Sequence, residues 1–202
     1  MGKGGQERKR EHYYRMAKKA GYRSRASFKL EHLNFRYGIM KRGDVVVDLG
    51  AAPGGWLQIA RERVGNEGFV LGVDLQQIAK LHYGNVKTDV ANIADPSTTE
   101  LIRQDLPRQA DVVISDVSPK ISGVWSVDHF RSIELVRATL SIAGQVLRPE
   151  GNMLVKVFQG ELFDEFLNEV RKKFEFIKIS KPPASRKGSA EAYIIAKGLR
   201  SV

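Results

Sequence analysis

The segment DLGAAPGGW, residues 48–56, joins a short apolar run at 44–49 to a predicted helix at 56–64. Small residues between a strand and a helix are typical of the ligand-binding loop that follows the first strand of an open α/β sheet, because glycine lets the backbone approach a ligand closely. The loop is not the dinucleotide fingerprint GxGxxG, since Ala52 replaces the second glycine and Pro53 follows it. It also lacks the Gly-Lys-Ser/Thr of a phosphate-binding loop. The segment therefore predicts an α/β fold with a loop for a nucleotide-like cofactor.

The rest of the chain continues this alternation of strands and helices. We predict strands near 44–49, 68–74, 86–88, 110–115, 152–158, 174–179 and 192–197, and helices near 8–21, 24–37, 56–64, 97–105, 128–147 and 162–173. Such alternation produces a mostly parallel sheet that is covered on both faces. The last two strands are joined by a loop without a helix, so we expect them to pair antiparallel. Pro149 and Gly151 are expected to end the long helix.

The composition indicates an ordinary globular protein of 202 residues, of which 42% are hydrophobic and 28% charged. The absence of cysteine excludes a disulfide framework, a thiol nucleophile and a thiolate zinc site. The four histidines show no ligand spacing, so no metal site is expected. No apolar run approaches the ~20 residues of a membrane span, and no apolar stretch follows the basic N-terminus as it would in a secretory signal. We therefore expect a cytoplasmic protein that uses neither a membrane nor a metal.

The positive charge is concentrated at the N-terminus. Residues 1–42 contain 13 Lys and Arg against 3 Asp and Glu, whereas residues 43–202 contain 20 of each kind. Aromatic residues are interleaved with these charges: Tyr13, Tyr14, Tyr22, Phe28, Phe35 and Tyr37. Cations beside aromatic faces suit a phosphate backbone and unpaired bases, although a merely solubilising tail is the alternative. We predict that 1–42 is a basic, RNA-binding helical extension of a single unit whose body is 43–202.

Acidic residues stand where three predicted strands meet their loops: Asp48, Asp74 and Asp116. Ligands of open α/β sheets bind at the carboxyl ends of the strands. Acids in this place suit a ligand with a cationic amino acid part and a ribose diol, and S-adenosylmethionine has both. A tight turn with capping acids is the structural alternative, and one such loop alone leaves an NAD-linked oxidoreductase open.

Lys156 lies inside the apolar strand VKVF, residues 155–158. A buried lysine needs a carboxylate partner, and Asp116 and Glu191 are the candidates because each is expected at a strand end. The alternatives are an edge-strand cation for Lys156 and a turn-initiating aspartate before Pro119 for Asp116. Next to the cofactor loop, we interpret both residues as parts of an active site.

Four motifs in this order, DLGAAPGGW, SDVSP, VKVFQG and SAEAY, resemble the FtsJ/RlmE family of ribose 2′-O-methyltransferases. The resemblance covers nearly the whole chain, from YRSRASFKL at 22–30 to Tyr193. It implies a Rossmann-like, class I S-adenosylmethionine-dependent methyltransferase fold. In that fold a seven-stranded, mostly parallel sheet has its last strand antiparallel.

The resemblance also implies the site residues. The family's Lys-Asp-Lys-Glu catalytic tetrad corresponds to Lys29, Asp116, Lys156 and Glu191. Its cofactor contacts correspond to Gly54, Trp56, Asp74, Asp89 and Asp116. By resemblance, Asp74 would hold the cofactor ribose and Asp89 the adenine amino group.

The implied function is methylation of a ribose 2′-hydroxyl, on a uridine, in large-subunit ribosomal RNA by a monomeric enzyme. Ribosomal RNA or the large subunit would be its partner. A tRNA-modifying relative and a noncatalytic RNA-binding protein with this fold are the alternatives. Lys156 would either take the hydroxyl proton, which requires its neutral form, or orient the hydroxyl and stabilise the developing alkoxide.

Overall fold

The computed structural model describes residues 3–185 and 188–201, and only the backbone course within 3–10. The helices are α1 (Lys3–Lys19), α2 (Ser27–Tyr37), α3 (Gly55–Val64), α4 (Ser97–Asp105), α5 (Trp125–Val146) and α6 (Phe163–Lys173). The strands are β1 (Val45–Leu49), β2 (Phe69–Asp74), β3 (Val86–Val90), β4 (Ala110–Ser115), β5 (Leu147–Phe158), β6 (Phe174–Ser180) and β7 (Glu191–Leu199).

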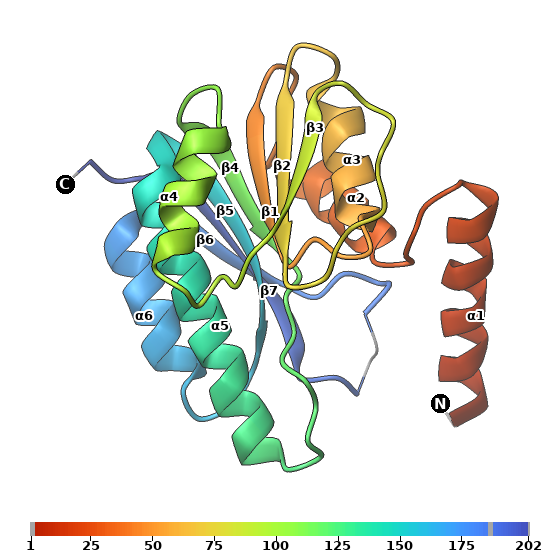
Figure 1. Cartoon of the computed structure of the whole chain (residues 1–202). Helices are drawn as coiled ribbons and strands as arrows, with labels where there is room; N and C mark the ends of the chain where they lie inside the picture. Colours follow the sequence, from red (N-terminus) through yellow and green to blue (C-terminus); the bar gives the residue numbers. More distant parts are fainter. Residues whose placement is uncertain (1–2, 186–187, 202) are drawn as a thin grey trace.

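The seven strands form one sheet in the order β3-β2-β1-β4-β5-β7-β6 (Figure 1). Strands β1 to β5 pair in parallel, and β7 is antiparallel to both of its neighbours, β5 and β6. This confirms the predicted fold class, and it confirms the antiparallel pairing of the last two strands. Because β7 inserts between β5 and β6, β5 is an interior strand.

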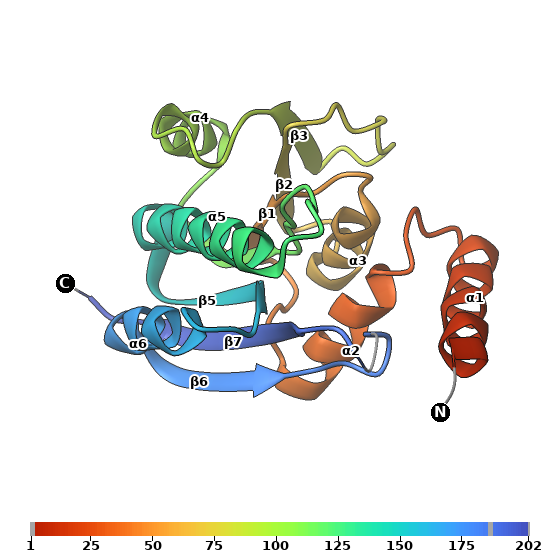
Figure 2. The ribbon, with the colours of Figure 1, turned by 90° about the horizontal axis from the view of Figure 1, so that it is seen from below.

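Two layers of helices enclose the sheet (Figure 2). Helices α4, α5 and α6 pack on one face, and their apolar residues form one core cluster with the sheet. Helices α2 and α3 pack on the other face and form a second cluster. Within the described residues, no helix has the length and apolar character that crossing a membrane requires.

Two predicted boundaries around α5 were wrong. The helix begins at Trp125 instead of 128, and the carboxylate of Asp128 accepts hydrogen bonds from the backbone N–H groups of Ser122 and Gly123, which fixes the preceding loop against the first turn. Pro149 does not end the helix but lies inside β5, which begins at Leu147. A proline is tolerated there because the pairing of β4 with β5 shifts register between Ala110 and Val112.

The N-terminal extension has two parts. Helix α1 stands beside the body (Figures 1 and 2), and Tyr13 contacts Phe28 of α2 with ring centroids 5.8 Å apart. Helix α2 is part of the core instead, because Leu30 and Leu33 are completely buried. After α2, the side chain of Asn34 accepts hydrogen bonds from two backbone N–H groups of the following turn. The division of function at residue 42 stays a prediction.

Candidate active site

A cavity of about 640 Å³ opens at the carboxyl ends of β1, β2 and β4. After β1 the chain adds β2 and β3 on one side of it, and then crosses to add β4 and β5 on the other side. Open α/β sheets bind ligands at the point where the strand order reverses in this way. The volume is that of a pocket for a small molecule or cofactor. The lining residues are Gly50, Ala52, Asp74, Leu75, Gln76, Ala91, Asn92, Ile93, Asp116, Val117, Ser118, Pro119, Lys120, Arg131, Glu134 and Leu135.

The glycines of the loop after β1 have different surroundings. Only Gly50 lines the cavity, and a β-carbon there would lie 2.8 Å from Cβ of Val117. A β-carbon on Gly54 would lie 2.9 Å from the guanidinium of Arg23, and one on Gly55 would lie 2.8 Å from Oγ of Ser27. Gly54 and Gly55 therefore make room for the N-terminal extension, and their predicted role in letting a ligand approach stays a prediction.

Two carboxylates line the cavity, Asp74 at the end of β2 and Asp116 after β4, and a third, Asp48 of β1, is buried near them. Asp74 Oδ2 accepts a hydrogen bond from the backbone N–H of Ala52 (2.9 Å), which ties the end of β2 to the loop after β1. Asp48 is completely buried, and neither of its side-chain oxygens has a hydrogen-bond partner. Burial, together with the charges of Asp116 and Asp74, raises the pKa of Asp48 well above its usual range. The carboxylates of Asp74 and Asp116 on the lining make the cavity suited to a cationic ligand.

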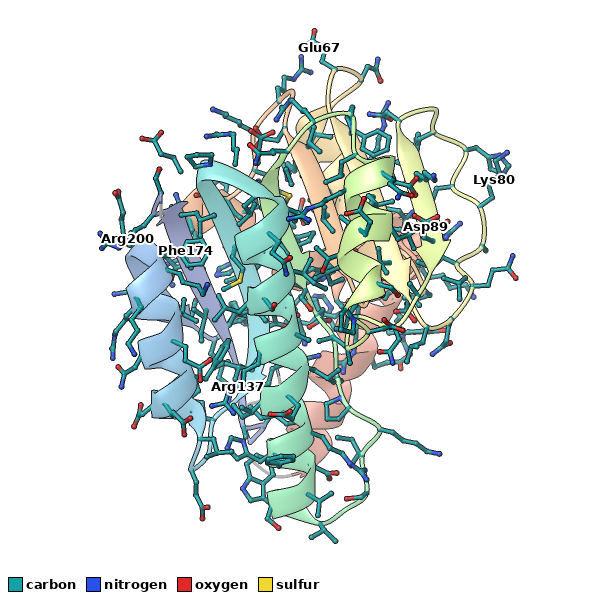
Figure 3. The ribbon with its side chains drawn as sticks, turned by 60° about the vertical axis from the view of Figure 1, so that its left-hand side comes forward. Glu67, Lys80, Asp89, Arg137, Phe174 and Arg200 are labelled. Carbon is teal, nitrogen blue, oxygen red and sulfur yellow. The ribbon has the colours of Figure 1, made fainter. Side chains whose placement is uncertain are left out.

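Trp56 and Asp89 do not line the cavity. The indole of Trp56 is buried, and its Nε1 donates to the carbonyl of Ala26 (2.9 Å). Asp89 lies on β3 beside α4 (Figure 3), where burial and a hydrogen bond with Asp105 raise its pKa to about 6. Asp105 is in turn paired with Lys87. The cofactor contacts assigned to Gly54, Trp56 and Asp89 stay predictions.

Lys156 and Asp116 form a buried ion pair beside the cavity. Lys156 is 6% exposed, and its Nζ lies 3.1 Å from Asp116 Oδ1 while it donates to the Asp116 carbonyl at 2.6 Å. The alternative of an edge-strand cation was wrong, because β5 is an interior strand. Tyr193 lies opposite Lys156 on β7, and its hydroxyl donates to Asp116 Oδ1 at 2.8 Å.

A second ion pair adjoins the first. Lys29 Nζ, from α2, lies 2.7 Å from Glu191 Oε1 at the start of β7, and Ser185 Oγ donates to the same oxygen. Burial alone would raise the pKa of Glu191, but the Lys29 ammonium and the hydrogen bonds from Lys29 and Ser185 lower it overall. Of the two candidate partners for Lys156, Asp116 is the one in contact, while Glu191 pairs with Lys29. The four predicted tetrad residues are thus brought together as two adjoining pairs.

Sequence reasoning missed Arg23, which ties three segments together. Its guanidinium donates to the backbone carbonyls of Pro53 (3.2 Å), Ala79 (2.6 Å) and Lys80 (2.9 Å), and its backbone N–H donates to Gln58 Oε1 (2.8 Å). The extension is therefore attached to the loop after β1 and to the loop after β2. Backbone carbonyl acceptors leave no signal in a sequence, so this contact could not be found there.

A family model described as FtsJ-like methyltransferase matches residues 22–199. The chain belongs to this family. Among relatives of this FtsJ-like methyltransferase, the ribosomal RNA large subunit methyltransferase E of Methanocaldococcus jannaschii is 50% identical over 194 residues, which cover 95% of this chain and 79% of the relative. The protein of the same name from Methanothermobacter thermautotrophicus is 50% identical over 99% of this chain and 95% of its own length.

Solved structures share the fold. A Plasmodium falciparum protein described as a ribosomal RNA methyltransferase superposes with a TM-score of 0.81 at 24% identity, over 90% of this chain and 100% of its own. An S-adenosylmethionine-dependent O-methyltransferase of Thermotoga maritima superposes with a TM-score of 0.60 at 14% identity, over 86% and 66%. Family membership confirms the predicted enzyme class, a methyltransferase that uses S-adenosylmethionine, over the oxidoreductase.

Proposed function

We propose that this protein transfers a methyl group from S-adenosylmethionine to a ribose 2′-hydroxyl, on a uridine, in large-subunit ribosomal RNA. The observation that carries the proposal is the buried Lys156–Asp116 pair, because Asp116 also lines the cavity where a cofactor would bind. The relatives named ribosomal RNA large subunit methyltransferase E support this class of substrate. A monomer that acts in the cytoplasm on ribosomal RNA or the large subunit remains our expectation.

The cavity residues fit S-adenosylmethionine by charge and by polarity. The carboxylates of Asp74 and Asp116, which line the cavity, would face the cationic amino acid part and the ribose diol. Apolar residues of the lining, among them Leu75, Ile93 and Leu135, provide a surface for a flat base. When bound, the cofactor supplies an electrophilic methyl group on its sulfonium.

Lys156 is placed to hold the substrate hydroxyl. An ammonium has three N–H donors, of which one is donated to the Asp116 carbonyl, and the ammonium is also paired with the Asp116 carboxylate. Another donor would bind a hydroxyl, and the positive charge would stabilise the alkoxide that develops as the oxygen attacks. The contacts of the ammonium with the carbonyl and the carboxylate of Asp116 fix its position and so support an orienting and electrostatic role, in which the hydroxyl proton leaves to water. Alignment of the hydroxyl with the methyl group would contribute much of the rate.

The basic extension is proposed to bind the RNA backbone. In the described part of α1, its last turn carries Lys18 and Lys19, and Tyr14 is exposed on the same helix. A cationic helix attached to the active-site body through Arg23 would guide RNA toward the site. Arg8, Lys9 and Arg10 of this helix are expected to contribute to RNA binding, and their side chains lie outside the described residues.

The test is methyl transfer to large-subunit RNA by Lys156→Ala and Lys156→Arg, with the modified nucleotide mapped in the parental reaction. Lys156→Ala should lose nearly all turnover and keep its affinity for S-adenosylmethionine. Lys156→Arg keeps the charge but cannot act as a base, so substantial remaining turnover supports the electrostatic role. Lys178→Ala, on the exposed face of β6, is the matched control and should turn over normally. Parental rates in both Lys156 variants, or modification of tRNA alone, would overturn the proposal.

A further inference from the structure

An exposed apolar surface surrounds the start of α5. Four of its residues are half exposed or more: Ile121 (61%), Val124 (55%), Trp125 (51%) and Phe130 (54%). We call these four residues the α5 platform. Figure 1 shows the first turns of α5 extending beyond the carboxyl ends of the strands. Large apolar side chains gathered on a surface mark an interaction site more often than chance exposure.

Trp125 is held in a fixed orientation although half of its surface is open. Its indole stacks on His129, with ring centroids 5.8 Å apart and an interplanar angle of 17°, and on Phe158, at 6.2 Å and 25°. His129 is itself fixed, because its Nε2 accepts a hydrogen bond from the backbone N–H of Leu162 (3.0 Å) and its ring lies against Gly160, where a β-carbon would be 2.8 Å away. A preoriented ring loses little conformational freedom when a ligand stacks on it.

The α5 platform is continuous with the active site. Phe158 follows Lys156 by two residues on β5, so the two side chains leave the same face of the strand about 7 Å apart. Phe158 is also the register partner of Glu191. On the other side, Lys120 and Arg131 flank the α5 platform in sequence and line the cavity, so that cations adjoin the aromatic surface.

A nucleotide whose ribose reaches Lys156 must leave the base stack of an RNA helix. Lys156 is 6% exposed and the side chain of Asp116 is 19% exposed, so the hydroxyl has to enter a recess that a continuous A-form helix cannot reach. The nucleotide that enters loses stacking with its neighbours in the RNA. An aromatic face beside the recess offers a replacement, and such stacking accepts any base.

We propose that Trp125, supported by Phe158 and His129, is the stacking site for an unpaired nucleobase of the RNA beside the ribose that is methylated. The inference rests on the proposed function, since it takes the ribose to be bound at Lys156. The occupant is RNA because the α5 platform adjoins the ribose site and its flanking cations suit phosphates. The contact holds the RNA, and the methyl transfer itself remains at Lys156.

The first test separates binding of RNA from chemistry. Trp125→Ala should raise the KM for RNA by roughly 5- to 150-fold, the range expected for one base stack, with unchanged affinity for S-adenosylmethionine. Its melting temperature should fall because the contacts with His129 and Phe158 are lost, so the assay is run well below that temperature. Trp125→Phe keeps a stacking face and should restore most of the affinity. Phe176→Ala is the matched control, because Phe176 on β6 is similarly exposed (48%) but lies away from the site. An RNA KM for Trp125→Ala within twofold of the parent overturns the proposal.

The second test measures stacking without methyl transfer. The chain has two tryptophans, and Trp56 is buried, so an unpaired oligouridylate should quench the emission of Trp125. The quenching should be absent from Trp125→Phe and from a fully paired RNA duplex. If the oligouridylate quenches the parental protein but that protein does not methylate ribosomal RNA, the stacking site is supported and the proposed function is contradicted. Trp125→Ala that is normal on naked RNA but slow on assembled large subunits would mean that the α5 platform binds a protein, which overturns the stacking site.

Discussion

Replacing Arg23 with alanine is expected to weaken cofactor binding even though Arg23 does not line the cavity. Its guanidinium holds the loop after β1 through Pro53 and the loop after β2 through Ala79 and Lys80. The same two loops contribute Ala52 and Gln76 to the cavity. Without the guanidinium, the loops must be ordered at the moment when the cofactor binds.

The magnitude follows from the three hydrogen bonds, which measure 3.2, 2.6 and 2.9 Å. Hydrogen bonds to a charged group contribute about 1.5–3 kcal/mol each when they are well shielded. Arg23 is only half-buried, and water will replace part of the loss at the released carbonyls, so about 1 kcal/mol for each bond is a better figure. A total near 3 kcal/mol exceeds the 1.4 kcal/mol that corresponds to a tenfold change in Kd. We therefore expect the Kd for S-adenosylmethionine to rise at least about tenfold.

The assay is calorimetric titration of S-adenosylmethionine into Arg23→Ala, Arg23→Lys and Arg36→Ala. Arg36 belongs to the same extension, and its guanidinium stacks on Tyr37 at 5.4 Å, so its removal is a matched loss of charge without a change at the loops. Arg23→Lys should be intermediate, since an ammonium cannot reach three carbonyls in the same geometry. If the cofactor Kd of Arg23→Ala lies within twofold of that of Arg36→Ala, the reasoning is refuted.

Three further predictions concern the cofactor, pH and RNA. Asp74→Ala should weaken S-adenosylmethionine binding about 10- to 100-fold by calorimetry, because a charge-assisted hydrogen bond to the ribose is removed; unchanged affinity would place the ribose elsewhere. The pKa of Asp89 is raised to about 6, so the folded state retains a proton that the unfolded state releases near pH 4, and stability should fall as pH rises from about 4 to 6. Asp48, whose pKa is also raised, contributes to the same fall, so Asp89→Asn should make the fall shallower in thermal unfolding curves without removing it, and an unchanged slope would contradict the assignment. The pKa of Asp105 is lowered, so its titration affects stability only below about pH 4. Neutralising the basic residues of α1 should weaken RNA binding and reduce its salt slope by about 0.7 for each single-strand phosphate that the helix no longer neutralises, whereas an unchanged slope would show that the helix does not bind RNA.

The sequence by itself determined the class of fold and the class of site. Alternating apolar and amphipathic segments are local patterns, and so is the helix-free connection between the last two strands, which predicted their antiparallel pairing. Acids at the ends of strands could be expected to converge for the same reason, since the carboxyl ends of parallel strands share one edge. Lys156 could also be recognised as a candidate site residue from the sequence, because its immediate neighbours in the strand are apolar.

Only the tertiary structure decided which groups meet. Lys29 and Glu191 are 162 residues apart in the chain, and their pairing depends on β7 entering the sheet between β5 and β6. The same insertion makes β5 an interior strand and leaves Asp116, rather than Glu191, as the partner of Lys156. The contact of Arg23 with backbone carbonyls likewise depends on how a basic segment packs against two distant loops. Local sequence patterns determine the helices and strands. Which side chains pair depends on strand register and on packing between segments far apart in the chain, and a local pattern does not encode either of these.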